Sequence, residues 1–327
     1  MFPHRARRRS GRPSRRRPLG YAAVASVALL GVTAAGTMYV TARAHDAGEL
    51  VSSSASSTTT ATTEATVEAV TAPTSAKPTP TSSGSAEPDA DALLAEAVGS
   101  VTVEAGARLS VAVLDTESGR SAVYGDGAFD TASIVKADIL ASLLLRAQDA
   151  GRELTAQEKT YASAMIRDSD NASATALWEA IGRARGLAEA NERFGLDDTV
   201  GGDGVLWGLT QTTAADQLTL LRQVFGDADD SELDETSRDC LQGLMGDIAV
   251  GQDWGVSAAG SSGSALKNGW LPRSATGLWD INSVGRVEVD GRAYLVAVLS
   301  DGNSTKAGGI SMVEAAAKAA VSALATA

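Results

Sequence analysis

Apolar and polar residues alternate in two separate stretches of the chain, which is the pattern of half-buried β-strands. The first stretch, residues 108–127, alternates on both sides of a turn at residues 117–119 and predicts a β-hairpin. The second, residues 277–302, predicts two strands joined near Asp290 and Gly291, a dipeptide that favours tight turns. Strands are therefore expected near both ends of the region from residue 89 to residue 327.

Between these strands the apolar positions recur with helical spacing. Residues 132–150 are apolar on nearly every face and stop at Gly151, so we expect a helix buried in the middle of the domain. Further helices are predicted at residues 89–98, 155–167, 173–181, 185–194, 213–225, 231–245 and 310–325. This order of elements predicts an α+β fold, in which an antiparallel sheet formed from both ends of the domain carries a helical insertion.

The first 42 residues have the pattern of a membrane or export signal. Residues 1–19 contain eight arginines and no acidic residue, and residues 20–42 form an uncharged stretch of 23 residues. That length suits a transmembrane anchor, which needs about 20 residues, whereas a small-x-small sequence at residues 42–44 suits a cleaved signal. Both interpretations leave the basic tip in the cytoplasm and place the domain outside the cell membrane, either as a single-pass membrane protein or as a secreted one.

Residues 43–88 are rich in Ser, Thr, Ala and Pro and contain no aromatic residue. This composition predicts a disordered stalk, because it cannot bury enough apolar surface to form a core. Residues 89–327 are long enough for one domain that buries ~70–75% of the surface its unfolded chain exposes.

Charge and residue usage exclude several classes of function. From residue 46 onward the chain has 19 basic and 40 acidic residues, a net charge of 19 − 40 = −21, which argues against nucleic acid as a partner. The only cysteine is Cys240, and the only histidines, His4 and His45, precede the domain. A Ser-His-Asp triad and a histidine-based zinc site are therefore impossible in the domain, and a nucleophile must find its base among Lys, Asp, Glu or Tyr.

Ser133 and Lys136 are the first candidates for such a pair. Positions i and i+3 share a face of a helix, and a lysine in a buried helix loses solvation, which lowers its pKa and makes it usable as a base. Ser-x-x-Lys also arises by chance, as Ser264 and Lys267 illustrate. That second match enters a predicted strand, where the two side chains point to opposite faces.

Two more short motifs follow. Ser169, Asp170 and Asn171 lie in a loop before a new helix, where all three residue types are also ordinary helix N-caps. Lys267, Asn268 and Gly269 open a predicted strand and could be a plain strand start.

Ser-x-x-Lys, Ser-Asp-Asn and Lys-x-Gly, in this order, resemble the signature of the serine β-lactamases and penicillin-binding proteins, most closely the class A β-lactamase branch. The resemblance covers residues 89–327. It implies a β-lactamase-like fold and a serine hydrolase that needs no metal and no cofactor. It also implies a small-molecule or peptidoglycan-derived substrate.

The resemblance assigns a role to each matching position. Ser133 corresponds to the acylated nucleophile, Lys136 to its base and Ser169 to the relay that protonates the leaving nitrogen. Asn171 would bind a side-chain amide of the substrate, and Lys267 would bind its carboxylate. Asn268 and Gly269, in the third motif, are the next substrate-binding positions. The Trp270 N–H would form the oxyanion hole together with the Ser133 N–H.

The sequence also departs from that family. Asn268 replaces the usual Thr or Ser, and Ser133 and Ser169 are only 36 positions apart (169 − 133), fewer than in typical class A enzymes. The loop at residues 195–213 contains no Glu, the residue that activates the deacylating water in class A enzymes. Its acids, Asp197, Asp198 and Asp203, are better interpreted as solvated turn residues.

We therefore expect an exported serine hydrolase that acts through an acyl-enzyme on β-lactams or D-alanyl-type cell-wall amides, with slow deacylation. A full β-lactamase and a slowly turning-over penicillin-binding hydrolase both fit this expectation. The alternative from another class is a non-catalytic module of the same fold that binds a cell-wall component.

Overall fold

Five antiparallel strands form the central sheet in the computed structural model, which describes residues 89–325. The strand order is β2-β1-β7-β6-β5, and the bounds are β1 Arg108–Asp115, β2 Ser121–Tyr124, β5 Ser262–Pro272, β6 Trp279–Val289 and β7 Arg292–Asn303. Strands from the beginning of the domain pair with strands from its end, since β1 pairs with β7 over eight residues. The predicted α+β fold is confirmed.

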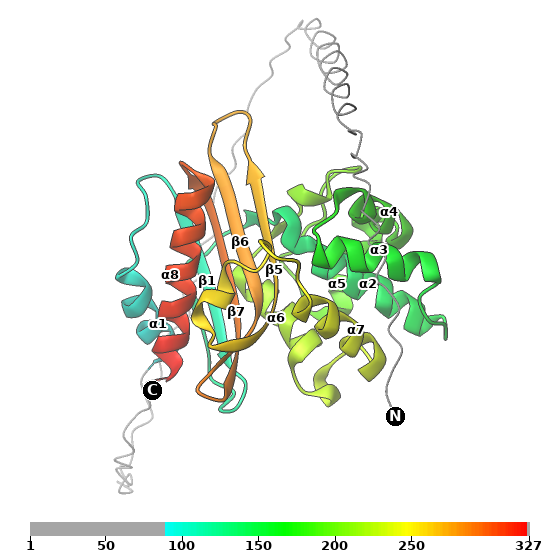
Figure 1. Ribbon diagram of the computed structural model, residues 1–327, viewed down its shortest axis with the longest axis horizontal. Coiled ribbons are helices and arrows are strands. Elements are labelled where there is room, and N and C mark those ends of the chain that lie inside the picture. The colour runs from blue at the N-terminus through cyan, green and yellow to red at the C-terminus, as the bar shows by residue number, and fades with distance from the viewer. Residues whose placement is uncertain (1–88, 326–327) are drawn as a thin grey trace, which may run out of the picture. The chain divides into compact units, whose positions relative to one another are not determined.

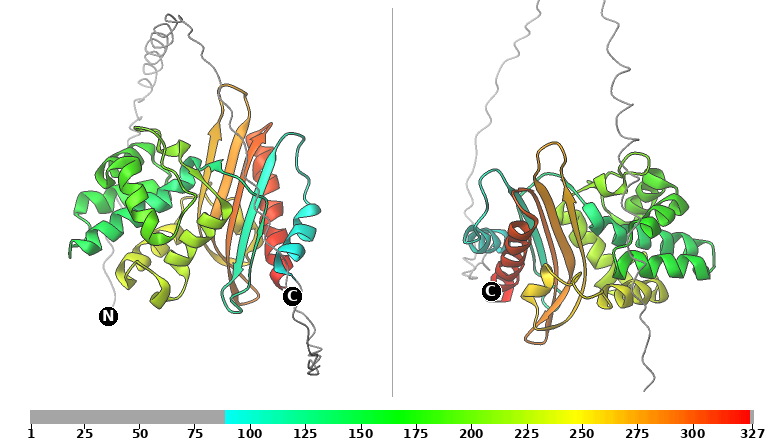
Figure 2. Two further views of the ribbon diagram at one scale, coloured as in Figure 1. Left: turned by 180° about the vertical axis from the view of Figure 1, so that it is seen from behind. Right: turned by 45° about the horizontal axis from the view of Figure 1, so that its top comes forward.

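Helices cover both faces of this sheet (Figures 1 and 2). On one face α8 (Lys306–Ala325) packs against β1, β6 and β7, and α1 (Ala90–Gly99) packs against α8. On the other face α6 (Ala214–Phe225) lies against β1, β6 and β7. Successive residues of a strand point to opposite faces, so β7 contributes to both cores and is buried along most of its length.

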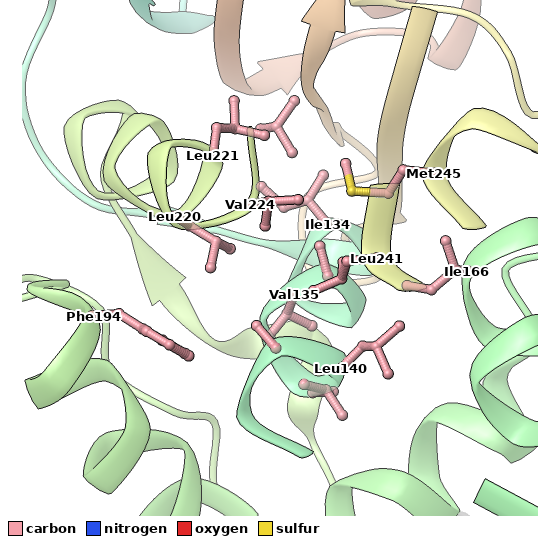
Figure 3. Close-up of a cluster of buried hydrophobic side chains, with 14 of the residues drawn as sticks. Ile134, Val135, Leu140, Ile166, Phe194, Leu220, Leu221, Val224, Leu241 and Met245 are labelled. Atoms are coloured by element: carbon pink, nitrogen blue, oxygen red, sulfur yellow. The ribbon is translucent and has the colours of Figure 1, made fainter. Parts of the chain in front are cut away.

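The helical insertion is built around α2 (Val135–Asp149), which is buried on nearly every side, as its sequence predicts. The helices around it are α3 (Ala156–Arg167), α4 (Asn171–Ile181), α5 (Arg183–Phe194) and α7 (Glu235–Gly246). Figure 3 shows Ile134 and Val135 among apolar side chains of α3, α5, α6 and α7. These contacts fix the start of α2, which directly follows the turn that contains the predicted nucleophile.

Helix starts differ from the predicted ones where a polar side chain caps the chain. Helix α4 begins at Asn171 because the Asp170 carboxylate accepts the Ser173 N–H at 2.7 Å. Helix α7 begins at Glu235, four residues later than predicted, because Asp234 caps the Ser237 N–H in the same way. Side-chain oxygens that accept these N–H groups satisfy donors that a helix start leaves unpaired.

A second sheet of two short strands was not predicted. It pairs β3 (Phe129–Asp130) with β4 (Gln211–Thr212) and so joins the chain before Ser133 to the end of the loop at residues 195–213. The predicted tip, membrane segment and stalk lie outside the described residues. Between residues 89 and 325 no helix is both long and apolar enough to span a membrane.

Candidate active site

Ser133 lies in a single 3-10 turn, η1 (Ala132–Ile134), directly before α2. The preceding residue, Ala132, has φ = 48°, a conformation that costs a residue with a side chain free energy. Neighbouring segments hold this turn: the Asn282 amide donates to the Asp130 and Thr131 carbonyls, and the Thr131 N–H donates to the Thr210 carbonyl. The strained turn is therefore determined by its surroundings.

Gly269 brings strand β5 against this turn. A methyl group on Gly269 would lie 2.6 Å from Ser133 N and 2.9 Å from Ile134 N, so no larger residue fits. The approach leaves the backbone of β5 beside the Ser133 N–H. Trp270 follows Gly269, so the two N–H groups that the resemblance assigns to the oxyanion hole come from adjoining segments.

The Lys136 side chain is fully buried and makes three hydrogen bonds, all to residues that sequence analysis singled out. Its Nζ donates to Ser169 O at 2.7 Å, to Ser169 Oγ at 3.0 Å and to Asn171 Oδ1 at 2.8 Å. Ser169 itself has φ = 57°. No hydrogen bond joins Lys136 Nζ to Ser133 Oγ among the described residues, although the two belong to successive turns.

Lys267 also donates a hydrogen bond to the Ser169 hydroxyl. Its Nζ donates to Ser169 Oγ at 3.2 Å and to Asn268 O at 3.0 Å, and its side chain is 1% exposed. Ser169 Oγ therefore accepts from two lysines that come from α2 and β5.

Burial changes the acid–base properties of both lysines. It lowers the pKa of Lys136 to about 7, against a smaller opposing effect of the Asp170 charge. Burial also lowers the pKa of Lys267 to about 7, with a further contribution from the charge of Lys136. Because two like charges that both contact Ser169 Oγ disfavour each other, the pair gives up a proton near neutral pH and one amine becomes a usable base.

The side chains of Asn268, in the third motif, and of Trp270, which follows the motif, contact other segments. Asn268 is fully buried, and its amide donates to the Gln252 carbonyl at 2.6 Å. The ring of Trp270 lies 6.0 Å from that of Trp254 and 3.7 Å from Lys306 Nζ, both centroid distances. The Asn268 Nδ2 group therefore holds the loop after α7, whereas Asn268 Oδ1 has no hydrogen-bond partner among the described residues.

The loop at residues 195–213 brings no acid to the lysines. Asp197, Asp198 and Asp203 are exposed, as expected of turn residues. The loop residue next to Lys136 is Trp207, in the 3-10 turn η2 (Trp207–Leu209), with its ring centroid 4.9 Å from Lys136 Nζ. Sequence analysis missed Trp207, because a single aromatic residue in a glycine-rich loop carries no periodic signal.

No group of three or more His, Cys, Asp or Glu side chains with the arrangement of a metal site occurs between residues 89 and 325.

Comparison with known proteins places this arrangement in a family. The model of the beta-lactamase enzyme family matches residues 144–325, which is 182 of 327 residues (325 − 144 + 1). The match includes Ser169 and Lys267 and begins after Ser133 and Lys136. A search of curated proteins finds no relative.

Solved structures share the fold. PBP-A is 19% identical with a TM-score of 0.61, covering 72% of this chain and 97% of PBP-A. A class A beta-lactamase from Mycobacterium abscessus is 22% identical with a TM-score of 0.59, covering 72% and 100%. A beta lactamase from Xanthomonas campestris pv. campestris is 21% identical with a TM-score of 0.57, covering 72% and 97%. The predicted fold and the predicted resemblance are confirmed.

Proposed function

Because the chain belongs to the beta-lactamase enzyme family of serine hydrolases, we propose that it is acylated at Ser133 by β-lactams or by D-alanyl-type amides of the cell wall. The observation that carries this proposal is the meeting of two buried lysines on one serine hydroxyl, Ser169 Oγ, beside the turn that holds Ser133. Burying two amines costs free energy, which argues against a purely structural role.

Acylation begins with the proton of Ser133. A neutral Lys136 has a lone pair with which to accept it, and a pKa of about 7 makes the neutral amine available near neutral pH. Ser133 Oγ then attacks the carbonyl carbon of the substrate. The N–H groups of Ser133 and Trp270 stabilise the negative charge that develops on the carbonyl oxygen.

The leaving nitrogen needs a proton when its bond to the carbonyl carbon breaks. The Ser169 hydroxyl donates it, and Lys136, which lies 3.0 Å from Ser169 Oγ, returns the proton taken from Ser133. Lys267 attracts a substrate carboxylate while it is protonated. The Asn171 amide has its oxygen turned to Lys136, so its Nδ2 donors are available for a substrate carbonyl.

Deacylation requires a base for water, and the described loop supplies none. The Lys136 amine contacts carbonyl, hydroxyl, amide and indole groups, and the nearby carboxylate of Asp170 accepts the Ser173 N–H at the start of α4. We therefore propose a long-lived acyl-enzyme. A single-residue mutant of PBP-A has been solved as an acyl-enzyme complex with penicillin G, which supports the fold's capacity to hold such an adduct.

We further propose that the domain is held outside the cell membrane by residues 20–42 and a stalk at residues 43–88. The support is the order of an arginine cluster, an uncharged span and a Ser/Thr/Pro-rich tract. Protease added to intact, wall-stripped cells should release the domain by cutting within the stalk. Full protection of the domain would contradict this topology.

The test of the function is labelling by a fluorescent penicillin. We expect a covalent adduct on the peptide that contains Ser133, and Ser133→Ala should abolish it. The matched control is Ser264→Ala, since Ser264 has the same spacing from a lysine but lies in strand β5. Labelling that survives Ser133→Ala would refute the assignment, and a wild-type protein that binds wall fragments without labelling would support the binding-module alternative.

A further inference from the structure

The indole of Trp207 is fixed in place between the loop and helix α4. Its Nε1–H donates to Thr175 Oγ1 at 3.1 Å, and the Thr175 hydroxyl donates to the Asn171 carbonyl at 3.0 Å. Asn171 also accepts from Lys136. The ring that covers Lys136 is therefore bonded to the same helix that supplies one of the acceptors of Lys136.

The surroundings of the Lys136 amine leave little room for water. Its three hydrogen bonds use all the donors of an ammonium group, and its side chain is fully buried. The ring of Trp207 adds an apolar neighbour 4.9 Å away. An aromatic face attracts a cation but accepts no proton, so this neighbour cannot share the role of base.

We propose that Trp207 is a positioning residue, whose ring keeps water from the Lys136 amine and holds the amine against Ser169 and Asn171. This inference rests on the proposed function, in which Lys136 is the base for Ser133. It gives the loop a role in acylation, although the loop lacks an acid for deacylation.

The effect of removing the ring has a definite sign. The charged groups that face Lys136 are Asp170, at the start of α4, which favours the protonated amine, and Lys267, on β5, which disfavours it. Without the ring, water reaches the amine and stabilises its charged form. Loss of the ring's own attraction for the ammonium acts the other way, but burial is the largest cause of the low pKa of Lys136. The pKa of Lys136 should therefore rise.

The test compares three variants of the full-length protein: Trp207→Ala, Trp207→Phe and, as control, Leu209→Ala in the same turn, whose side chain is 36% exposed. The first-order acylation rate constant with saturating fluorescent penicillin is measured from about pH 6 to about pH 10. We expect Trp207→Ala to move the midpoint upward by at least about one pH unit, which lowers the rate at pH 7 by at least about fivefold and restores it at higher pH. Leu209→Ala should keep the wild-type midpoint, and Trp207→Phe, which keeps an aromatic ring but loses the bond to Thr175, should shift the midpoint less than Trp207→Ala does.

A second readout separates this inference from the proposed function. The Lys136 side chain is titrated by NMR in wild-type and Trp207→Ala protein labelled at lysine, which requires no reaction. Failure of the wild type to label would refute the proposed function alone. A Trp207→Ala protein that unfolds cooperatively and titrates at the wild-type midpoint would overturn the role of Trp207, whatever the labelling result.

Discussion

The two walls of the candidate site differ in the chemistry that they bring to Ser133. One wall, formed by α2, α4 and β5, holds Lys136, Ser169, Asn171 and Lys267 in one hydrogen-bonded group. The other wall is the loop at residues 195–213, which places an indole beside Lys136 and leaves its three acids in solvent. The first wall can activate a serine and protonate a leaving nitrogen. The second offers no base for water.

The difference separates two steps that a complete β-lactamase must combine. Acylation and deacylation each need a proton to be removed, from a serine in the first step and from water in the second. A protein with only the first wall should react with β-lactams and then remain modified. Substitutions can therefore test each wall separately.

The largest effect is expected from removing the base of the first wall. Lys136→Ala should lower the acylation rate by about 10²–10⁴-fold, the usual contribution of general acid–base assistance. The control is Lys159→Ala, because Lys159 is exposed and pairs with Glu153 away from the site. The measurement is the rate of labelling by fluorescent penicillin. Equal rates for Lys136→Ala and wild type would assign the base to another group.

The second prediction concerns a substitution that introduces an acidic residue into the loop at residues 195–213. Trp207→Glu should place a carboxylate near the Lys136 amine and accelerate loss of the acyl group by at least about tenfold, a fraction of what a well-placed base contributes. Trp207→Gln is the matched control, since it has the same shape without a base. Release of the label is followed after a chase with unlabelled penicillin. Equal release by both variants would mean that absence of an acid does not limit deacylation.

The third prediction concerns pH. Lys136 must be neutral to accept a proton, so acylation should be slow at low pH and rise through a midpoint near the pKa of Lys136, about 7. With one such group the rate constant should rise roughly tenfold between about pH 6 and about pH 8. The penicillin concentration is saturating, so weaker substrate binding after Lys267 loses its charge does not change the measured acylation rate constant. A rate that is constant over this range would contradict a lysine base with this pKa.

The smallest effect is expected at Asp203. Asp203 is exposed in the loop, so Asp203→Asn should change the deacylation rate by less than about twofold, in keeping with substitutions of solvated surface residues. A large decrease in deacylation would identify Asp203 as a base and would overturn the description of the second wall.

Much of the first wall could be predicted from the sequence, because each of its motifs occurs where local structure begins. Ser133 precedes an apolar helix, Asn171 begins another, and Lys267 lies in a strand; the strand also explains why Ser264 is a chance match. The hydrogen bond between Ser133 Oγ and Lys136 that the i, i+3 spacing suggests does not occur among the described residues, since the three donors of Lys136 go to Ser169 and Asn171.

The second wall could not be predicted, because its shape depends on distant contacts. The two-residue strands β3 and β4 are too short for a periodic pattern, yet they tie the loop to the turn of Ser133. Trp207 lies beside Lys136 with its indole bonded to Thr175, a residue 32 positions earlier in the chain. Outside this wall, the hydrogen bond from the Asn268 amide to the Gln252 carbonyl, sixteen residues earlier in the chain, also could not be predicted.

The central claim is that acylation outpaces deacylation, and stopped-flow hydrolysis of penicillin by the wild-type protein tests it most directly. The account predicts a burst equal to the concentration of protein, followed by a slow steady phase whose rate matches the loss of label from Ser133. Rapid multiple turnover without a burst would contradict it, because water would then be activated by a group that the second wall is said to lack.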